Sequence, residues 1–287
     1  MKATLRGTEI YFDIAGMQLA PVGTDFIERP VIFMLHGGPG GDHLGFKRHS
    51  LELQEIAQLV FIDHRGCGRS KKTKQSDYSL KNNIEDIEAL RKYLGLKKIC
   101  ILGGSYGGIV AQGYAIRYSK NIDKLILSVT MPSYRGAIES KEYLKEFGTA
   151  KQISICQHLW NGTFNSHNHI MQYFKAMDPF YSLTARKTRK PLFAKSKTIW
   201  SHEALNEGFG GFLRKFDFIP QLKKIKCPTL VLAGQEDWIC RPSQSKIIAE
   251  HIPNSQLKIF KDCGHAIGVD AHDKYIKAIK GFLKNGK

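Results

Sequence analysis

The sequence carries no sign of a membrane span, a secretory signal or a disulfide framework. None of its apolar runs approaches the roughly 20 residues that a helix needs to cross a bilayer. Its first residues, MKATLRGTEI, lack the uninterrupted apolar stretch of a signal peptide. The six cysteines form no C-x-x-C pair, which predicts free thiols in a reducing compartment. We therefore expect a cytoplasmic protein with no membrane partner.

Acidic residues are scarce relative to basic ones. The chain has 26 Asp and Glu against 43 Lys and Arg, which gives a formal net charge of +17. Many of the cations gather at residues 186–190 and 223–224. Such an excess can attract an acidic partner over long distances, or it can simply solvate the surface. Because no nucleic-acid-binding motif accompanies the charge, we expect a solvated basic surface and no nucleic-acid partner.

Short apolar runs alternate with segments of helical spacing along most of the 287 residues. Continuous apolar runs of this kind are typical of strands buried on both faces, and helical spacing is clearest over 84–94 and 275–283. The alternation predicts the α/β class, with a mostly parallel twisted sheet and helices on both faces. An N-terminal β-hairpin over 4–14 precedes it. The predicted strands are 31–35, 59–62, 99–102, 125–129, 229–233 and the more polar 256–260.

The alternation fails between residues 133 and 217. This stretch contains no convincing buried strand, and it shows short amphipathic patterns over 138–147 and 170–177. We interpret it as a helical cap inserted over the edge of the sheet. The predicted domains are therefore a core, made of 1–132 and 218–287, and a cap, 133–217.

Ser105 is the most informative single residue. It lies in a G-x-S-x-G pattern, residues 103–107, directly after a predicted strand and directly before a predicted helix. A sharp turn between such elements strains the serine backbone and leaves almost no room for side chains two residues away on either side. The pattern therefore predicts a nucleophile elbow that presents the serine hydroxyl above the sheet edge.

A serine nucleophile needs a base and a third group that orients the base. His265 follows the last predicted strand, and Asp237 follows the strand before it, in the chain order expected for this architecture. Glu236 and Asp262 are rival acids in the same loops. We predict that Ser105, His265 and Asp237 form a catalytic triad.

The HGGPG run at residues 36–40 follows the first long apolar strand. Its glycines let the backbone pass close to Ser105. The N–H groups of Gly38 and Tyr106 are therefore the predicted oxyanion hole, which stabilises negative charge on the tetrahedral intermediate.

Taken together, these motifs resemble the α/β-hydrolase superfamily, and within it the prolyl aminopeptidase (proline iminopeptidase) branch. The residues that carry the resemblance are HGGPG at 36–40, DHRGCGRS at 63–70, GGSYGG at 103–108, Asp237 and GH at 264–265. The resemblance implies a serine hydrolase with an acyl-enzyme mechanism and neither cofactor nor metal. It also implies that Asp63 and Arg65 shape a loop.

Substrate selection rests on fewer residues. By the resemblance, the substrate is the N-terminal residue of a short peptide, preferably proline, and Glu207 of the cap holds its protonated amine. Trp238 stands where related peptidases carry a second acid, and we expect it and Gly37 to contact substrate as well. Aromatic residues of the cap either line an apolar pocket or hold the cap to the core; they are Phe174, Phe180, Tyr181, Trp200, Phe209 and Phe212.

Two alternatives remain open at this point. The first is a carboxylesterase or lactonase that acts on small acyl compounds. The second, from a different class, is a non-catalytic ligand-binding protein on the same fold. His167 and His169 lack a third ligand at suitable spacing, so we expect no metal there.

Overall fold

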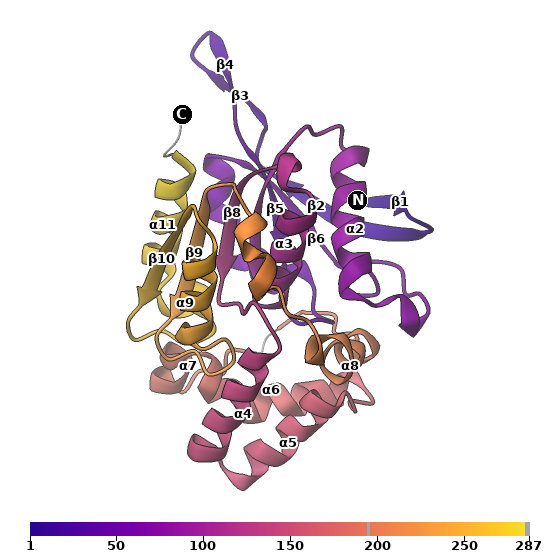
Figure 1. The fold of residues 1–287 in the computed structure, drawn as a ribbon, viewed down its shortest axis with the longest axis vertical. Coiled ribbons are helices and arrows are strands. Elements are labelled where there is room, and N and C mark those ends of the chain that lie inside the picture. The colour runs from indigo at the N-terminus through magenta and orange to yellow at the C-terminus, as the bar shows by residue number, and fades with distance from the viewer. Residues whose placement is uncertain (194–195, 285–287) are drawn as a thin grey trace.

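A sheet of eight strands runs through the centre of the computed structural model, which describes residues 1–193 and 196–284 (Figure 1). Its strands are β1 (Lys2–Leu5), β2 (Thr8–Ala15), β5 (Val31–Leu35), β6 (Gln58–Ile62), β7 (Ile99–Gly104), β8 (Ile122–Ser128), β9 (Thr229–Gly234) and β10 (Ser255–Phe260). They lie in the order β1-β2-β6-β5-β7-β8-β9-β10. The pairs β1 with β2 and β2 with β6 are antiparallel, and all the others are parallel. The predicted α/β class and the N-terminal hairpin are confirmed.

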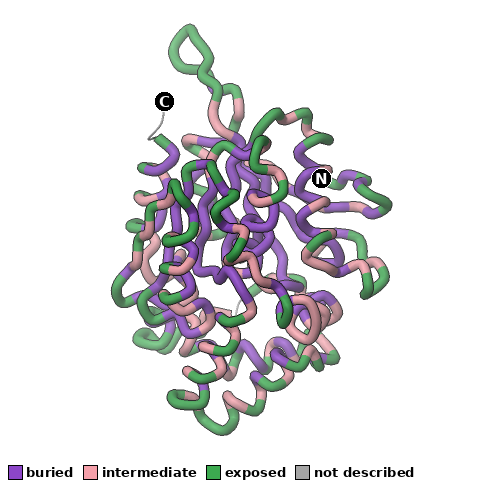
Figure 2. Tube along the Cα trace, viewed as in Figure 1, coloured by how far each residue is buried: buried purple, intermediate pink, exposed green. Residues whose placement is uncertain are grey.

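Both faces of the sheet are covered, which explains why the strands are apolar without interruption. Every residue of β5 is buried. Phe33 and Leu35 belong to the hydrophobic core on one face, whereas Ile32 and Met34 belong to the core on the other. Successive side chains of a strand point to opposite faces, so a strand between two cores needs apolar residues at every position. Figure 2 shows these buried strands at the centre of the molecule.

Helices from separate parts of the chain form the two covering layers. One core contains side chains of α2 (Leu80–Tyr93), α3 (Tyr106–Arg117) and α9 (Pro242–His251). The other contains side chains of α1 (His43–Arg48) and α11 (His272–Lys284). The remaining short helices of the core are η1 (Leu51–Glu55), η2 (Gln75–Asp77), η3 (Ser119–Asn121), η5 (Ile219–Lys224) and α10 (Ile267–Asp270).

Between β8 and β9 the chain leaves the sheet and forms helices at one end of the molecule (Figure 1). Ser133 and Asp217 form an isolated antiparallel β-bridge where this segment departs and returns. Its helices share a hydrophobic cluster of their own, which includes Leu144, Trp160 and Tyr173. That residues 133–217 act as a cap domain stays a prediction. The helices are α4 (Arg135–Phe147), α5 (Ala150–Asn161), α6 (His167–Tyr181), α7 (Leu183–Thr188), α8 (His202–Gly210) and η4 (Phe212–Arg214).

The segment between β2 and β5, for which the sequence analysis predicts no strand, is a correction to that prediction. It folds into a second, two-stranded sheet of β3 (Leu19–Val22) and β4 (Asp25–Glu28). This hairpin projects from the end of the molecule opposite the cap segment and is exposed except at Ala20 (Figures 1 and 2). Its strands are short and Phe26 is 64% exposed, so the apolar and polar residues do not alternate between a core and solvent. The strand signal was therefore weak.

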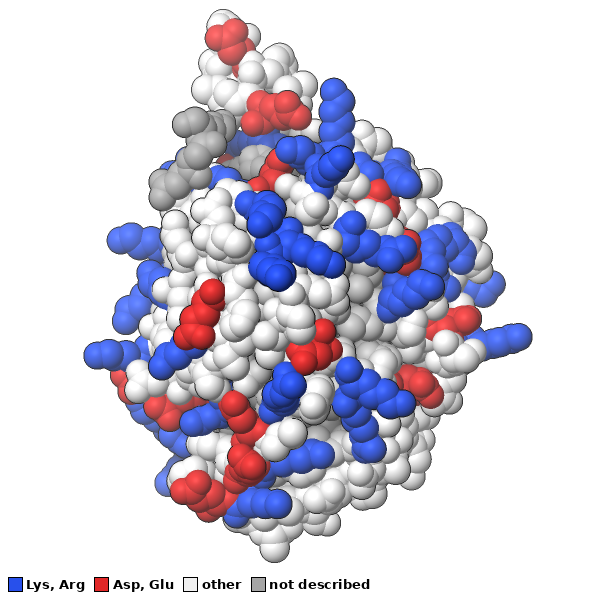
Figure 3. Space-filling model, viewed as in Figure 1, with Lys and Arg blue, Asp and Glu red and all other residues white. Residues whose placement is uncertain are grey.

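The surface carries its positive charge in a dispersed form. Figure 3 shows Lys and Arg side chains over the whole visible face, with Asp and Glu between them. All six cysteines are free and buried. Among the residues that the structure describes, no helix has both the length and the apolar character that crossing a membrane would require.

Candidate active site

Ser105 sits in a strained turn between β7 and α3. Its backbone angles are φ 53° and ψ −119°, in a region that residues with a side chain rarely adopt. A Cβ on Gly103 would lie 2.4 Å from the Gly107 carbonyl oxygen, and one on Gly107 would lie 2.1 Å from the Leu35 carbonyl oxygen. The strand packs so tightly against the start of the helix that only glycine fits at either position. The G-x-S-x-G spacing is thus explained by sterics.

Two hydrogen bonds to the neighbouring strand hold the elbow in place. The Ser105 N–H donates to the Ser128 carbonyl at 2.9 Å. The Thr130 hydroxyl donates to the Ser105 carbonyl at 2.7 Å. Because both main-chain groups of the serine are fixed, the direction of its hydroxyl is set by the sheet.

The side chains of Ser105, His265 and Asp237 form a chain of two hydrogen bonds. His265 follows β10, and its Nε2 lies 3.1 Å from Ser105 Oγ. Its Nδ1 lies 2.8 Å from Oδ2 of Asp237, which follows β9. The three residues are far apart in sequence and come together because their parallel strands end at the same edge of the sheet.

Asp237 is oriented by the backbone of its own loop. Its side chain is fully buried, and its Oδ1 accepts hydrogen bonds from the N–H groups of Ile239 at 2.9 Å and Cys240 at 3.0 Å. The rival acids Glu236 and Asp262 are exposed. The structure therefore brings Asp237, and neither rival, to the imidazole of His265.

The predicted cap segment, residues 133–217, directly contacts the loop that carries His265. The Ala266 N–H donates to the Tyr181 carbonyl at 2.8 Å. The Tyr181 ring meets the His265 imidazole edge to face, with ring centroids 5.7 Å apart. Sequence reasoning placed Tyr181 only among aromatic residues of the cap. Its support of His265 is a long-range contact for which no local pattern gives a signal.

Gly37, in the HGGPG run at residues 36–40, lies close to Ser105. A Cβ on Gly37 would lie 3.2 Å from Ser105 Cβ, so this backbone is in van der Waals contact with the nucleophile. Gly38 has φ +123°, and a Cβ there would meet the backbone nitrogens of Gly40 and Gly41 at 2.9 Å. Tyr106 is the first residue of α3, and N–H groups in the first turn of a helix have no acceptor within it. The Tyr106 N–H is thus free of the helix ladder.

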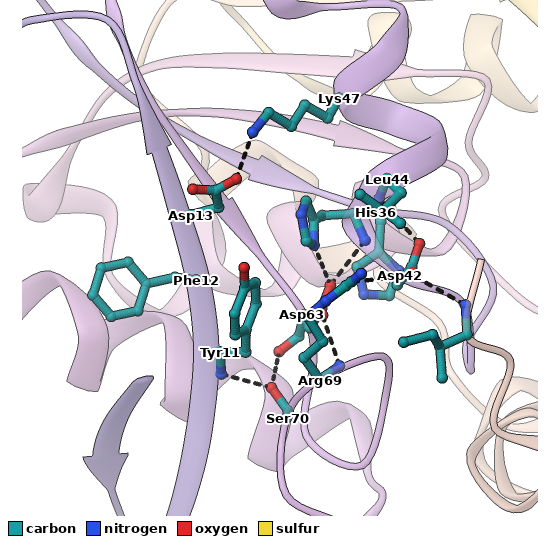
Figure 4. A network of polar contacts seen from close by, with 12 residues as sticks. Tyr11, Phe12, Asp13, His36, Asp42, Leu44, Lys47, Asp63, Arg69 and Ser70 are labelled. Atoms are coloured by element: carbon teal, nitrogen blue, oxygen red, sulfur yellow. Dashed lines mark hydrogen bonds and ion pairs between the residues drawn. The ribbon is translucent and has the colours of Figure 1, made fainter. Parts of the chain in front are cut away.

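A buried polar network around Asp63 lies close to residues 36–40, the predicted oxyanion loop (Figure 4). Asp63 Oδ1 accepts hydrogen bonds from the backbone N–H of His43 at 2.8 Å and from its Nδ1 at 2.7 Å, and Oδ2 accepts one from the Arg69 N–H at 2.8 Å. Burial favours the protonated carboxyl, but the hydrogen bond from His43 and the nearby His36 keep the pKa of Asp63 below its usual value. Arg65 forms a bidentate pair with Asp86 at 2.7 and 2.9 Å. Asp63 and Arg65 thus have structural partners in the loops behind the site.

His36 begins the oxyanion loop and is buried against His64. Its Nδ1 lies 2.7 Å from the Gly37 carbonyl, and its Nε2 accepts a hydrogen bond from the His64 N–H at 3.2 Å. An unprotonated Nε2 is required for that bond, so His36 is the neutral tautomer with its proton on Nδ1. Burial lowers the pKa of both His36 and His64. Both rings therefore stay uncharged at neutral pH.

A cavity of about 1360 Å³ opens beside Ser105 and His265. Trp238 and Gly37 line it, as predicted for substrate-binding residues. Trp238 is almost fully buried, and its ring meets those of Phe180 and Tyr181 edge to face at 5.9 and 6.2 Å. Of the six aromatic cap residues singled out in the sequence, four line the cavity: Phe174, Tyr181, Trp200 and Phe209.

The charges on this cavity are almost all positive. Among the described residues that line it, Asp42 is the only carboxylate, whereas Arg48, Arg189 and Lys197 also line it. The side chain of Asp42 is fully buried, and its oxygens already have hydrogen-bond donors. It accepts hydrogen bonds from the N–H groups of Leu44 at 3.0 Å and Ile199 at 2.9 Å. The cavity therefore offers a substrate no free carboxylate.

The position of Glu207 differs from the substrate-binding position that the sequence analysis predicts. Its Oε1 accepts a hydrogen bond from Gln75 Nε2 at 2.7 Å in an exposed position, and it does not line the cavity. The reason is the orientation of α8. Leu205 faces the cavity and Gly208 packs against the oxyanion loop, where a Cβ would lie 2.1 Å from Pro39 Cγ. Glu207 therefore falls on the side of the helix toward η2, away from the nucleophile.

Asp237, Cys240 and His265 are the only group in the described part of the chain whose ligand atoms lie close enough to hold a metal ion, within 4.8 Å of one another. Both Asp237 oxygens and the Nδ1 of His265 already form hydrogen bonds. Burial raises the pKa of the Cys240 thiol well above its usual value, so the thiolate that a soft metal requires is disfavoured. The sequence analysis did not predict that Cys240 lies beside Ser105, because no motif in the sequence includes Cys240.

The parallel sheet, the strained serine elbow and the loops gathered at one sheet edge define the class of α/β hydrolases. The family model described as alpha/beta hydrolase fold matches residues 30–271. The chain belongs to this family and is a hydrolase.

Individual relatives and solved structures show which members of the family the chain is similar to. A protein named proline iminopeptidase PfmaB from Pestalotiopsis fici is 31% identical over 96% of this chain and 99% of its own length. A proline iminopeptidase from Lactobacillus helveticus is 30% identical over 98% of this chain and 96% of its own length. A solved α/β-fold hydrolase from Bacillus anthracis superposes with a TM-score of 0.81 at 20% identity, covering 98% of both chains. Within the family, the chain is thus similar to proline iminopeptidases.

Proposed function

We propose that this protein is a serine hydrolase that works through an acyl-enzyme. The observation that carries the proposal is the pair of hydrogen bonds from Ser105 Oγ to His265 Nε2 and from His265 Nδ1 to Asp237 Oδ2, at 3.1 and 2.8 Å. They lie on the wall of a cavity large enough for a substrate. This arrangement supplies the nucleophile, the general base and the group that orients the base. It speaks against a purely ligand-binding role.

In the proposed reaction, His265 removes the proton of Ser105 as the hydroxyl attacks a substrate carbonyl. The N–H groups of Gly38 and Tyr106 stabilise the resulting oxyanion. His265 then gives its proton to the leaving group, and the acyl-enzyme forms as the scissile bond breaks. Water, deprotonated by His265, hydrolyses the acyl-enzyme and restores Ser105. No step requires a cofactor or metal.

The leading substrate is the N-terminal proline residue of a short peptide. The names of the two similar proteins support this choice, and the aromatic lining suits an apolar ring such as that of proline. The buried, unpaired cysteines suit a reducing compartment, and we place the enzyme in the cytoplasm.

A second candidate is the hydrolysis of carboxylic esters or lactones. One observation favours it: among the residues that the structure describes, Asp42 is the only carboxylate on the cavity, and its oxygens accept hydrogen bonds from backbone N–H groups. Recognition of a protonated amine requires a buried carboxylate, because an unpaired ammonium group in an apolar site is costly. An ester or lactone makes no such demand.

The two candidates are separated by assaying prolyl and other aminoacyl arylamides beside short-chain p-nitrophenyl esters. Turnover of prolyl arylamide that is lost in Ser105→Ala supports the peptidase. Ester turnover alone, again lost in Ser105→Ala, supports the second candidate and removes the first. If the wild type hydrolyses none of them and does not react with a fluorophosphonate, the serine hydrolase proposal fails.

A further inference from the structure

A second, smaller cavity meets the nucleophile from another side. Its volume is about 300 Å³, and Gly38, Ser105 and Tyr106 line the end that belongs to the core. Ile109, Met131, Ile239 and Cys240 of the core line it as well, and the remaining wall comes from the segment 133–217, chiefly from α4, the end of α5 and η4. Ser105 and Gly38 line both cavities, so the proposed reaction centre is where the two meet.

The position of His265 assigns a different part of the substrate to each cavity. His265 lines the large cavity but not the small one. The leaving group must receive its proton from His265, so it departs into the large cavity. The acyl group, which stays on Ser105, then has the small cavity available on the side of the oxyanion donors.

Two cations without a carboxylate partner line the small cavity. Among the described residues, neither Lys141 nor Arg214 forms an ion pair with Asp or Glu, whereas Arg135, at the start of α4, pairs with Asp217 at 2.8 Å. No Asp or Glu lines this cavity in the described chain. Burial, followed by the nearby charges of Arg214 and Lys145, lowers the pKa of Lys141. Lys141 thus lies in a positive environment.

Neutral groups hold both cations against the cavity wall. Arg214 donates from Nε to the Phe209 carbonyl at 3.0 Å and from NH2 to the Trp160 carbonyl and, at 3.3 Å, to Asn161 Oδ1. Lys141 Nζ lies 5.3 Å from the centroid of the Trp160 ring, and Trp160 lines both cavities. These contacts fix the position of two like charges without neutralising them. An anion between them would relieve their repulsion.

We propose that the small cavity is an acyl subsite for a carboxylate, and that the enzyme accepts half-esters or half-amides of short dicarboxylic acids. This inference rests on the proposed serine hydrolase function and on its ester candidate, because two cations at the acyl group would repel the protonated amine of a prolyl substrate. Ser105 Oγ bonds to the neutral carbonyl carbon, the ester C–O bond breaks, and the alcohol leaves with the proton from His265. The distal carboxylate stays beside Lys141 and Arg214. Water then cleaves the acyl-enzyme to release the dicarboxylic acid and regenerate the serine.

The rest of the molecule suits such a substrate. The net charge of +17 raises the local concentration of anions around the protein. Apolar side chains make up much of the lining of the small cavity, including Ile109, Met131, Ile138 and Leu213. A methylene chain would cross this wall while its carboxylate reaches the charged end, so chain length should matter.

The test compares 1-naphthyl monoesters of succinate, glutarate and adipate with neutral 1-naphthyl esters of matched length. We expect the wild type to prefer one anionic ester, and Lys141→Met to lower the ratio of kcat/KM for that ester to kcat/KM for its neutral match by about tenfold, the size of one hydrogen bond to a charged group. Arg214→Gln should lower the same ratio, and Lys141→Arg should largely restore it. The matched controls are Lys145→Met and Lys215→Gln, which remove exposed neighbouring cations that do not line the cavity.

A binding measurement keeps the subsite testable without turnover. Calorimetry on Ser105→Ala should show tighter binding of the preferred monoester than of its neutral match, and adding Lys141→Met, but not Lys145→Met, should remove the difference. A ratio unchanged by both Lys141→Met and Arg214→Gln, or a wild-type preference for neutral esters, would overturn the subsite. Failure of the wild type to hydrolyse any ester or arylamide would instead reject the proposed function, and calorimetry would still decide the subsite.

Discussion

In the proposed mechanism, Ser105 depends for its reactivity on residues more than a hundred positions away in the chain. The imidazole of His265 lies between the Ser105 hydroxyl and the Asp237 carboxylate, at 3.1 and 2.8 Å. Two backbone N–H groups hold the other oxygen of Asp237. The carboxylate therefore selects the tautomer of His265 that leaves Nε2 able to accept the serine proton.

Replacing Asp237 by asparagine should lower kcat by about 10⁴-fold, the size of this effect in other serine hydrolases. An amide in this place can donate to Nδ1, which favours the wrong imidazole tautomer while the geometry is kept. Steady-state kinetics on whichever ester or arylamide the wild type hydrolyses will measure the effect. Glu236→Gln is the matched control, because Glu236 is the exposed neighbour. Equal losses in both variants would contradict the assignment of Asp237.

Glu207→Gln should leave KM for a free-amine substrate within about twofold of the wild-type value, a change of less than 1 kcal/mol. Its carboxylate is bonded to Gln75 outside the cavity, so losing the charge should not affect substrate. The measurement compares KM for a prolyl arylamide with KM for a neutral ester. A large rise for the arylamide alone would show that the cap rearranges to bring Glu207 to the amine.

At the scale of elements, the junction between β7 and α3 is too tightly packed to admit a side chain on its glycines. Gly107→Ala should lower the free energy of unfolding by about 3 kcal/mol, because its Cβ would lie 2.1 Å from the Leu35 carbonyl oxygen and the backbone would have to move. Urea unfolding followed by circular dichroism measures the change.

Gly281→Ala provides the control for that comparison. Gly281 lies in α11 with no atom within 4 Å of an added Cβ. Alanine there should raise stability by about 0.5–1 kcal/mol through helix propensity. If both variants change stability equally, the tight packing at the elbow is not what makes Gly107 necessary.

The same elements show what the sequence could and could not predict. The buried strands and the G-x-S-x-G turn have strong local signals, since a strand between two cores must be apolar throughout and the elbow must have glycine on each side. The strands β3 and β4 are almost entirely exposed, so their apolar and polar residues do not alternate and the sequence analysis predicts no strand there. The orientation of α8 depends on its packing against Pro39, a tertiary contact, which is why Glu207 was misplaced. That Lys141 and Arg214 both line the small cavity likewise depends on how the cap helices pack, which is a tertiary arrangement.

At the scale of the whole molecule, the buried pair His36 and His64 makes stability depend on pH. Burial lowers both pKa values in the folded state from the ordinary value of 6.5. As pH falls below 6.5, the unfolded chain binds these protons before the folded protein does, so folding stability decreases. Each histidine contributes a slope of up to about 1.4 kcal/mol per pH unit.

Urea unfolding at pH 7.5, 6.5 and 5.5 should therefore show stability that is nearly constant above pH 6.5 and falls below it. His64→Phe should make the fall shallower, because it removes one of the two buried rings that the unfolded chain protonates first. A wild-type stability that rises on acidification, or a slope that His64→Phe leaves unchanged, would contradict this explanation.

The central claim, that Ser105 is the nucleophile of an acyl-enzyme, is tested most directly by labelling the intact protein with a fluorophosphonate and locating the adduct by mass spectrometry. We predict a single adduct on Ser105 that abolishes hydrolysis, no adduct in Ser105→Ala, and slower labelling in Asp237→Asn. An adduct on another residue, or hydrolysis that continues in Ser105→Ala, would contradict the claim.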